Sequence, residues 1–174
     1  MKNALYLALA LALLVFLVRY FYFKPMLVFG QPAPDFTAPG MQGDSIRLQD
    51  HRDYYVLLDF WGSWCGPCRA ENPILSMLHQ RYENQVFQSA KGIRFISVAL
   101  DRDPEAARAA IEKDQLRWPM QILQQEMMDG PVAKLYGIKS IPTKYLIGPD
   151  GRIILANPDI KELDDYLAKD AVKN

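Results

Sequence analysis

The feature that most constrains the fold is an apolar strand that runs directly into a pair of cysteines. The run Tyr54–Trp61 is almost continuously apolar and aromatic, which is typical of a strand buried on both faces in the centre of a sheet. Gly62 and Ser63 end the run, and the motif Trp-Cys-Gly-Pro-Cys follows at residues 64–68. Apolar residues at helical spacing then predict a helix from Arg69 to about Gln85. Both cysteines are therefore expected where a central strand passes into a helix.

Strand and helix patterns alternate along the rest of the chain. Apolar runs bounded by turn residues predict strands, and capping residues followed by apolar spacing predict helices. Their order is typical of an α/β domain in which helices on both faces flank a central mixed β-sheet. Further strands are expected at Ser45–Leu48, Gly92–Leu100, Thr143–Ile147 and Arg152–Ala156, and further helices from Pro104 to about Asp114, between Asp129 and Gly137, and after a cap at Asn157-Pro158.

The small number of cysteines limits what they can do. The chain has 174 residues, and its two cysteines lie three apart, so it has no framework of structural disulfides. A bond between Cys65 and Cys68 would close a very short loop and stabilise the fold little, which suits a bond that opens and closes. Acidic and basic residues balance at 20 each, so no basic excess points to a nucleic-acid partner.

The N-terminal segment predicts a membrane anchor. Residues 4–18 are unbroken apolar sequence, and Tyr20–Phe23 extends the run past Arg19, which reaches the ~20 residues of a spanning helix. A cleaved signal peptide is the alternative, but residues 17–24 contain no small residue for a cleavage site. We expect an uncleaved anchor over residues 1–24, a linker over 25–34 and a folded domain over 35–174. Positive charges flank both ends of the apolar run, so they do not set its orientation.

The cysteine motif carries redox chemistry. At the first turn of a helix, the Cys65 sulfur faces unpaired backbone N–H groups and the positive end of the helix dipole, and both favour the reactive thiolate. Cys65 is thus expected to form a mixed disulfide first, and Cys68, one turn further in, to resolve it. Pro67 stiffens the loop, and Trp64 covers the approach. Such a redox-active disulfide needs no bound cofactor.

Two further features accompany the motif. Asp59 lies six residues before Cys65 in an otherwise apolar strand, and burial raises the pKa of a carboxyl toward neutrality. We expect Asp59 to accept the Cys68 proton during resolution; the alternative is a carboxyl that is only hydrogen-bonded under the sheet. Pro142 precedes a strand, after Ile141, and a proline there ends strand pairing and exposes backbone edges. Only ~5% of such bonds in folded proteins are cis, so the sequence alone does not predict the isomer.

These residues together resemble a known family. The segment from Val56 to Cys68 is similar to the active-site strand and loop of thioredoxin, including the buried Asp. The segments 33–36, 68–73 and Asp150-Gly151 resemble the TlpA/ResA branch, whose members are membrane-anchored thioredoxin-like proteins with the catalytic domain outside the cytoplasm. The resemblance implies a thioredoxin-like fold anchored in the cytoplasmic membrane by one N-terminal transmembrane helix, facing the periplasm. It also implies protein thiols and disulfides as substrates and a membrane electron donor; no oligomeric state follows.

The resemblance also assigns roles to residues. Cys65 corresponds to the nucleophile, Cys68 to the resolving thiol and Pro142 to a cis-proline that faces the disulfide, while the Ile141 backbone would pair with a substrate chain. Trp64, Gly66 and Pro67 would contact the substrate, and Glu71 matches an acidic residue near the family's active site. Asp59 is a departure from this branch that resembles thioredoxin itself. The Gly66-Pro67 pair also matches thioredoxin, whose potential of ~−270 mV implies a reductant.

Metal binding is the competing interpretation of the two cysteines. A zinc site needs two further ligands, and the two histidines, His51 and His79, stand far apart in the sequence. A thioredoxin-fold copper-binding module or metallochaperone that uses Cys65 and Cys68 is the alternative function, although its familiar form spaces the cysteines one residue wider. We expect no metal in the site.

Overall fold

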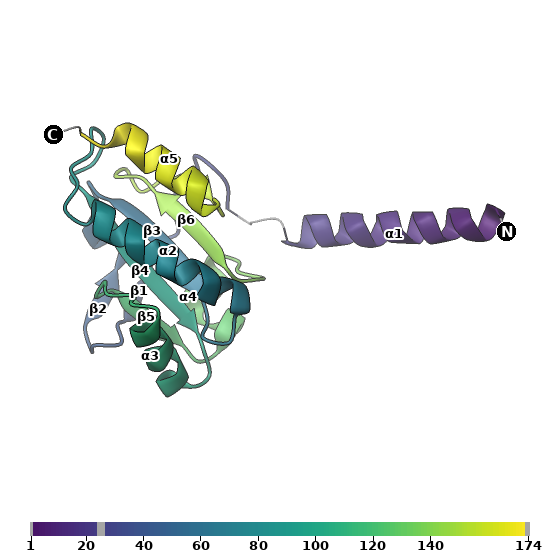
Figure 1. The fold of residues 1–174 in the computed structure, drawn as a ribbon, viewed down its shortest axis with the longest axis horizontal. Helices are drawn as coiled ribbons and strands as arrows, with labels where there is room; N and C mark the ends of the chain where they lie inside the picture. The colour runs from purple at the N-terminus through teal and green to yellow at the C-terminus, as the bar shows by residue number, and fades with distance from the viewer. Residues whose placement is uncertain (1, 24–26, 173–174) are drawn as a thin grey trace.

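The domain is built on a five-stranded mixed β-sheet with helices on both faces (Figure 1). The computed structural model describes residues 2–23 and 27–172. The strand order is β5-β4-β3-β6-β7, in which β3, β4 and β5 run parallel and β6 and β7 run antiparallel to their neighbours. This confirms the α/β fold and its central mixed sheet. The strands are β3 (Tyr55–Trp61), β4 (Ile93–Leu100), β5 (Gln121–Gln124), β6 (Thr143–Ile147) and β7 (Ile153–Ala156).

The central strand β3 divides the core into two layers. All seven of its residues are buried, and successive side chains point to opposite faces of the sheet. Leu57 and Trp61 pack against one cluster, with α2 (Gly66–Tyr82), α3 (Pro104–Lys113) and α5 (Ile160–Asp170). Leu58 and Phe60 pack against the other, with α4 (Pro131–Leu135) and the segment before β3. The apolar run expected at Tyr54–Trp61 is thus a strand buried on both faces.

The segment before β3 covers both edges of the sheet. The strands β1 (Thr37–Pro39) and β2 (Ser45–Arg47) form an antiparallel pair, and the backbone N–H of Met41 donates to Gln121 O on the edge strand β5 at 2.8 Å. On the opposite edge, the N–H of Gly30 donates to Ile153 O of β7 at 2.8 Å. Unpaired strand edges are templates for aggregation, so this segment closes the sheet at both sides. Two short 3₁₀ helices, Leu48–His51 and Met127–Asp129, complete the domain.

Strand β5 and the cap of the last helix differ from the prediction, and the short strand β1 was also not expected. The strand β5 was not expected, because only two apolar residues lie between its terminal glutamines, too few for a recognisable strand pattern. The last helix is capped by Asp159, whose carboxylate accepts from the Glu162 N–H at 2.7 Å, rather than by Asn157. Asn157 instead accepts from the Lys144 N–H at 3.4 Å, since the backbone there still follows β7. The expectation of a cap at Asn157 is therefore wrong by two residues.

A further helix, α1 (Lys2–Phe23), precedes the domain and is drawn apart from it in Figure 1. The side chains described in it, including Leu7, Leu11 and Leu13, are exposed. Among the residues that the structure describes, no helix combines the length and apolar character that crossing a bilayer requires. The side chains of Arg19 and of residues 20–23, expected at a membrane interface, lie outside the described ones.

The two-layered core predicts a large loss of stability when a buried side chain of β3 is truncated. Leu57 is fully buried in the cluster under α2, whereas Leu135 at the end of α4 is exposed. Leu57→Ala is expected to lower the free energy of unfolding by about 2–5 kcal/mol, because a cavity remains in a packed core. The matched control Leu135→Ala should change it by about 0.5 kcal/mol or less. Chemical denaturation measures both, and equal costs would contradict the assigned core.

Candidate active site

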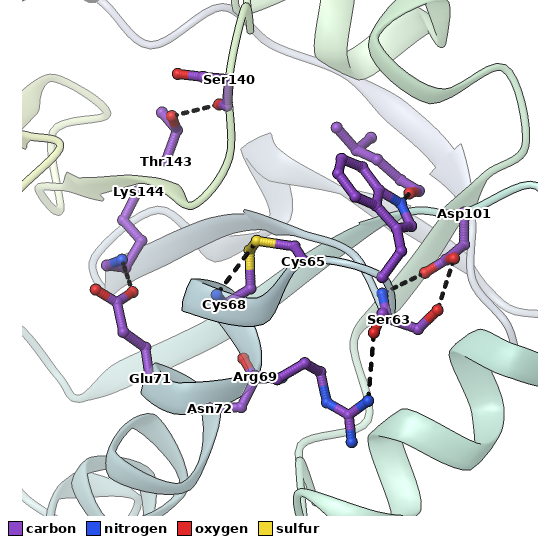
Figure 2. Close-up of a disulfide and its surroundings, with 12 residues drawn as sticks. Ser63, Cys65, Cys68, Arg69, Glu71, Asn72, Asp101, Ser140, Thr143 and Lys144 are labelled. Atoms are coloured by element: carbon purple, nitrogen blue, oxygen red, sulfur yellow. Dashed lines mark hydrogen bonds and ion pairs between the residues drawn. A yellow bond between two sulfur atoms is a disulfide. The ribbon is translucent and has the colours of Figure 1, made fainter.

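The two cysteines form a disulfide at the junction of β3 and α2. Figure 2 shows the bond between Cys65 and Cys68, whose sulfur atoms lie 2.04 Å apart. Cys65 is the N-cap of α2, and its Sγ accepts a hydrogen bond from the Cys68 backbone N–H at 3.2 Å. Both cysteines are buried, whereas Gly66 and Pro67 in the first turn of α2 are exposed. The expected position at the strand-to-helix junction is confirmed, and the helix already begins at Gly66.

The loop before the cysteines is held by hydrogen bonds to the end of β4. Trp64 Nε1 donates to Leu100 O at 2.8 Å, and the Trp64 side chain remains 53% exposed beside the disulfide. The Ser63 N–H and hydroxyl donate to the two carboxylate oxygens of Asp101 at 2.7 and 2.8 Å. A Cβ at position 62 would lie 2.7 Å from Trp64 Nε1, so only Gly62 permits this close approach. These hydrogen bonds hold the loop against the end of β4.

A second set of contacts ties the first turn of α2 to the end of α3. Arg69 Nη2 donates to Asp114 Oδ1 at 2.7 Å, and Asn72 Nδ2 donates to Asp114 Oδ2 at 2.8 Å. Arg69 Nη1 also donates to Ser63 O at 3.3 Å. Burial alone would raise the pKa of Asp114, but the hydrogen bonds from Arg69 and Asn72 outweigh it and the pKa is lowered. An ionised Asp114 thus holds the residue next to Cys68.

The proline before β6 has the isomer that the resemblance implied. The peptide bond between Ile141 and Pro142 is cis, and the Thr143 hydroxyl donates to Ser140 O at 2.8 Å across the same turn (Figure 2). Ile141 packs against the apolar cluster that contains both cysteines. The pairing of β6 with β3 begins only at Thr143, so the Ile141 backbone lies outside the sheet ladder.

Asp59 lies in β3 with its side chain on the face that carries the cysteines. It shares this face with Leu57 and Trp61, which belong to the same buried cluster as Cys65 and Cys68. The residue is 3% exposed, and its Oδ2 has no hydrogen-bond partner among the described residues. Burial raises the pKa of Asp59 to about 7. The Lys144 ammonium opposes burial by lowering this pKa, and the Glu71 carboxylate raises it by a smaller amount. The expected rise in the pKa of Asp59 is confirmed in direction. The alternative, a carboxyl that is only hydrogen-bonded under the sheet, does not hold for Oδ2.

Lys144, the cross-strand partner of Asp59, was not expected from the sequence. The two residues are paired in the register of β3 with β6. Lys144 is only 2% exposed, and its Nζ lies 2.5 Å from Glu71 Oε2 (Figure 2). A lone lysine in the apolar strand Thr143–Ile147 was the available signal, but its register against Asp59 depends on which strands pair.

Comparisons with known proteins identify the family. The AhpC/TSA family model matches residues 29–156. A relative described as thiol-disulfide oxidoreductase ResA from Bacillus thuringiensis is 31% identical over 153 residues, which cover 86% of this chain and 83% of the relative. The chain belongs to the AhpC/TSA family and to its ResA-like members.

Solved structures agree with this assignment to the ResA-like members. A thiol-disulfide oxidoreductase from Bacteroides fragilis aligns with a TM-score of 0.69 at 31% identity, covering 80% of this chain and 98% of that one. A thiol:disulfide interchange protein from a Bacteroides species aligns with a TM-score of 0.69 at 31% identity, covering 82% and 90%. The thioredoxin-like fold expected from the resemblance is therefore confirmed.

A metal centre at the cysteines would need further ligand side chains beside them. Within residues 2–23 and 27–172, no group of three or more His, Cys, Asp or Glu side chains is arranged to hold a metal ion. The His79 ring instead packs edge-on against Phe95, with ring centres 5.1 Å apart, and against Trp118 at 5.3 Å. This histidine thus contributes to the core rather than to a ligand set.

The buried Asp59 predicts a pH-dependent stability. Its pKa is about 7 in the fold, against an ordinary value of 3.8 for an aspartic acid, so the folded protein binds this proton more tightly than the unfolded chain. Its contribution is therefore fully present below about pH 3.8 and is lost as the pH rises through about 7. From pH 4 to 8 the wild type should lose up to about 4 kcal/mol relative to Asp59→Asn.

Urea denaturation at several pH values tests this expectation. The exposed Asp44 provides a matched control, and Asp44→Asn should follow the wild type across the range. Parallel pH dependence of the wild type and Asp59→Asn would show that Asp59 does not titrate as described.

Proposed function

We propose that this chain is a thiol–disulfide oxidoreductase that reduces disulfides of other proteins through Cys65 and Cys68. The observation that carries the proposal is the Cys65–Cys68 disulfide at the N-terminus of α2, where the Cys65 sulfur accepts the Cys68 backbone N–H. The same donor and the helix dipole stabilise a thiolate at Cys65 once the bond is reduced. The names of the ResA-like relatives agree with this chemistry.

The exchange proceeds in two steps that both involve the α2 N-terminus. In the reduced protein the Cys65 thiolate attacks one sulfur of a substrate disulfide, which forms a mixed disulfide and releases a substrate thiolate. Cys68 then gives its proton to the Asp59 carboxylate, and its thiolate attacks the Cys65 sulfur. The second substrate thiolate leaves, and the Cys65–Cys68 disulfide forms. Two electrons pass to the substrate, and an external thiol donor must restore them.

The substrate is expected to bind at the exposed side of the motif. Trp64, Gly66 and Pro67 are exposed around the disulfide, and Trp64 offers a large apolar face whose ring nitrogen is already bonded. The Ile141 backbone, next to the cis-Pro142, is outside the ladder of the sheet. It is therefore available to pair with an extended substrate segment, as expected from the family resemblance.

The direction of transfer is proposed from the Gly66-Pro67 pair between the cysteines. This pair matches thioredoxin, which reduces disulfides at a potential of ~−270 mV, against ~−120 mV for a strong oxidant. We propose that electrons arrive from a membrane donor. A measured potential above about −150 mV would contradict a reducing role.

We further propose that residues 1–24 anchor the domain in the cytoplasmic membrane with the active site in the periplasm. The support is the apolar sequence 4–18, the absence of small residues at 17–24 and the exposed leucines of α1. The described part of α1 does not by itself meet the requirement for a span. The anchor therefore depends on the sequence and on the resemblance to membrane-anchored relatives.

Insulin reduction tests the exchange activity. The wild type should accelerate insulin precipitation by dithiothreitol, and Cys65→Ser should abolish the acceleration because the attacking sulfur is gone. Cys68→Ser should accumulate a mixed disulfide that non-reducing electrophoresis detects, because the resolving sulfur is missing. Absence of any Cys65-dependent activity, together with tight copper binding, would instead favour the copper-binding alternative.

A reporter fusion tests the topology. Alkaline phosphatase fused after Asn174 should be active in cells, because the enzyme needs export to form its disulfides. The protein should also remain with membranes after an alkaline carbonate wash, and removal of residues 1–24 should release it. A fusion that is inactive although it is expressed would contradict the periplasmic location.

A further inference from the structure

A buried lysine lies opposite one carboxyl in the sheet and forms an ion pair with another on α2. Lys144 of β6 is the register partner of Asp59 in β3, so their side chains lie on the same face of the sheet. The next pair on this face is Leu146 with Leu57, and both belong to the cluster that contains the cysteines. Its Nζ lies 2.5 Å from Glu71 Oε2. Glu71 lies on α2 three residues after Cys68 and keeps 32% of its side chain exposed. The lysine thus forms an ion pair with a carboxylate at the protein surface and lies opposite a carboxyl inside the core.

Burying this lysine is costly for the fold. Removing an ammonium from water is compensated only by close and well-placed opposite charge. The Glu71 carboxylate supplies such a partner at one end. Well-packed hydrophobic residues often replace a buried ion pair without loss of stability, so stability alone does not account for the charge of Lys144.

We propose that Lys144 is a positioning residue for disulfide exchange, which acts through Asp59: its ammonium, held in place by Glu71, sets the charge around the carboxyl that receives the Cys68 proton. The inference rests on the proposed function of Cys68. In the step concerned, the thiol of Cys68 and the carboxylate of Asp59 become a thiolate and a carboxylic acid. Lys144 neither gains nor loses a proton.

The groups that face Asp59 act with opposite signs. From β6, the Lys144 ammonium lowers the pKa of Asp59, and from α2, Glu71 raises it. The cysteines at the start of α2 share the same cluster. From β4, the register partner is Ser97, an uncharged residue whose Oγ accepts from Trp118 Nε1 at 3.0 Å. The charge balance at Asp59 is thus determined by one cation and one anion that are bound to each other.

This arrangement gives a signed test. Lys144→Met removes the cation, and Glu71→Gln removes the anion, and both substitutions break the same ion pair. If the pair only held β6 against α2, both variants would disturb Asp59 in the same direction. If Lys144 acts by charge, the titration midpoint of Asp59 rises in Lys144→Met and falls in Glu71→Gln.

The midpoint can be measured by NMR on the carboxyl carbon of Asp59 in the oxidised full chain, in detergent micelles with labelled aspartate. We expect an upward shift in Lys144→Met, a downward shift in Glu71→Gln and a midpoint near that of the wild type in Lys144→Arg, which keeps the charge. Lys144→Gln should repeat the upward shift if the Met variant does not fold. The control Lys161→Met removes an exposed lysine that pairs with Asp165 on α5 and should leave the midpoint unchanged.

The rate of mixed-disulfide resolution should follow the same signs. The pH midpoint of this rate, measured by stopped flow, is expected to shift to higher pH in Lys144→Met and to lower pH in Glu71→Gln. Midpoints that stay fixed, or that move in the same direction in both variants, would overturn the role of Lys144 while wild-type insulin reduction persists. If the wild type shows no Cys65-dependent insulin reduction, the proposed function is overturned instead. The NMR titration of Asp59 does not depend on that activity.

Discussion

The pairing of β3 with β4 and β6 governs the position of the active site. It buries all seven residues of β3, and the chain leaves the sheet through residues 62–64 before α2 begins. Cys65, the N-cap of α2, therefore lies against the unpaired N–H groups of the helix N-terminus. The redox chemistry follows from this junction, because a thiolate is stabilised at that place before any further side chain contributes.

The same pairing places charge inside the core. The register of β3 with β6 brings Lys144 opposite Asp59, and α2 adds Glu71 from above. A buried carboxyl with a pKa of about 7 is unfavourable for stability at neutral pH. Such a carboxyl can exchange protons near physiological pH, which a surface carboxyl cannot do equally well. The fold thus gives up some stability beneath the disulfide for proton transfer in the proposed reaction.

The segment between β4 and β5 holds the loop that carries the cysteines. Asp101, directly after β4, accepts two hydrogen bonds from Ser63, and Asp114, at the end of α3, binds Arg69. Asp101 precedes α3 in the sequence and binds the residue before Trp64, whereas Asp114 follows α3 and binds the residue after Cys68. Because the loop and α2 are held from the same segment, the geometry of the disulfide depends on the packing of α3.

The sequence alone predicted the elements that depend on local pattern. The apolar run of β3, the cysteines at its end, the helix α3 and the strands β6 and β7 follow from residue periodicity and turn chemistry, because each is decided by neighbours a few positions away. The hypothesis that Asp59 takes part in proton transfer also came from local sequence, because Asp59 is a single charged residue in an apolar run. Strand β5, whose glutamines are buried by pairing, and the partners of Asp59 became evident only from the folded structure. Strand order and register bring residues 59, 71 and 144 together, and register depends on packing across the whole sheet rather than on local sequence.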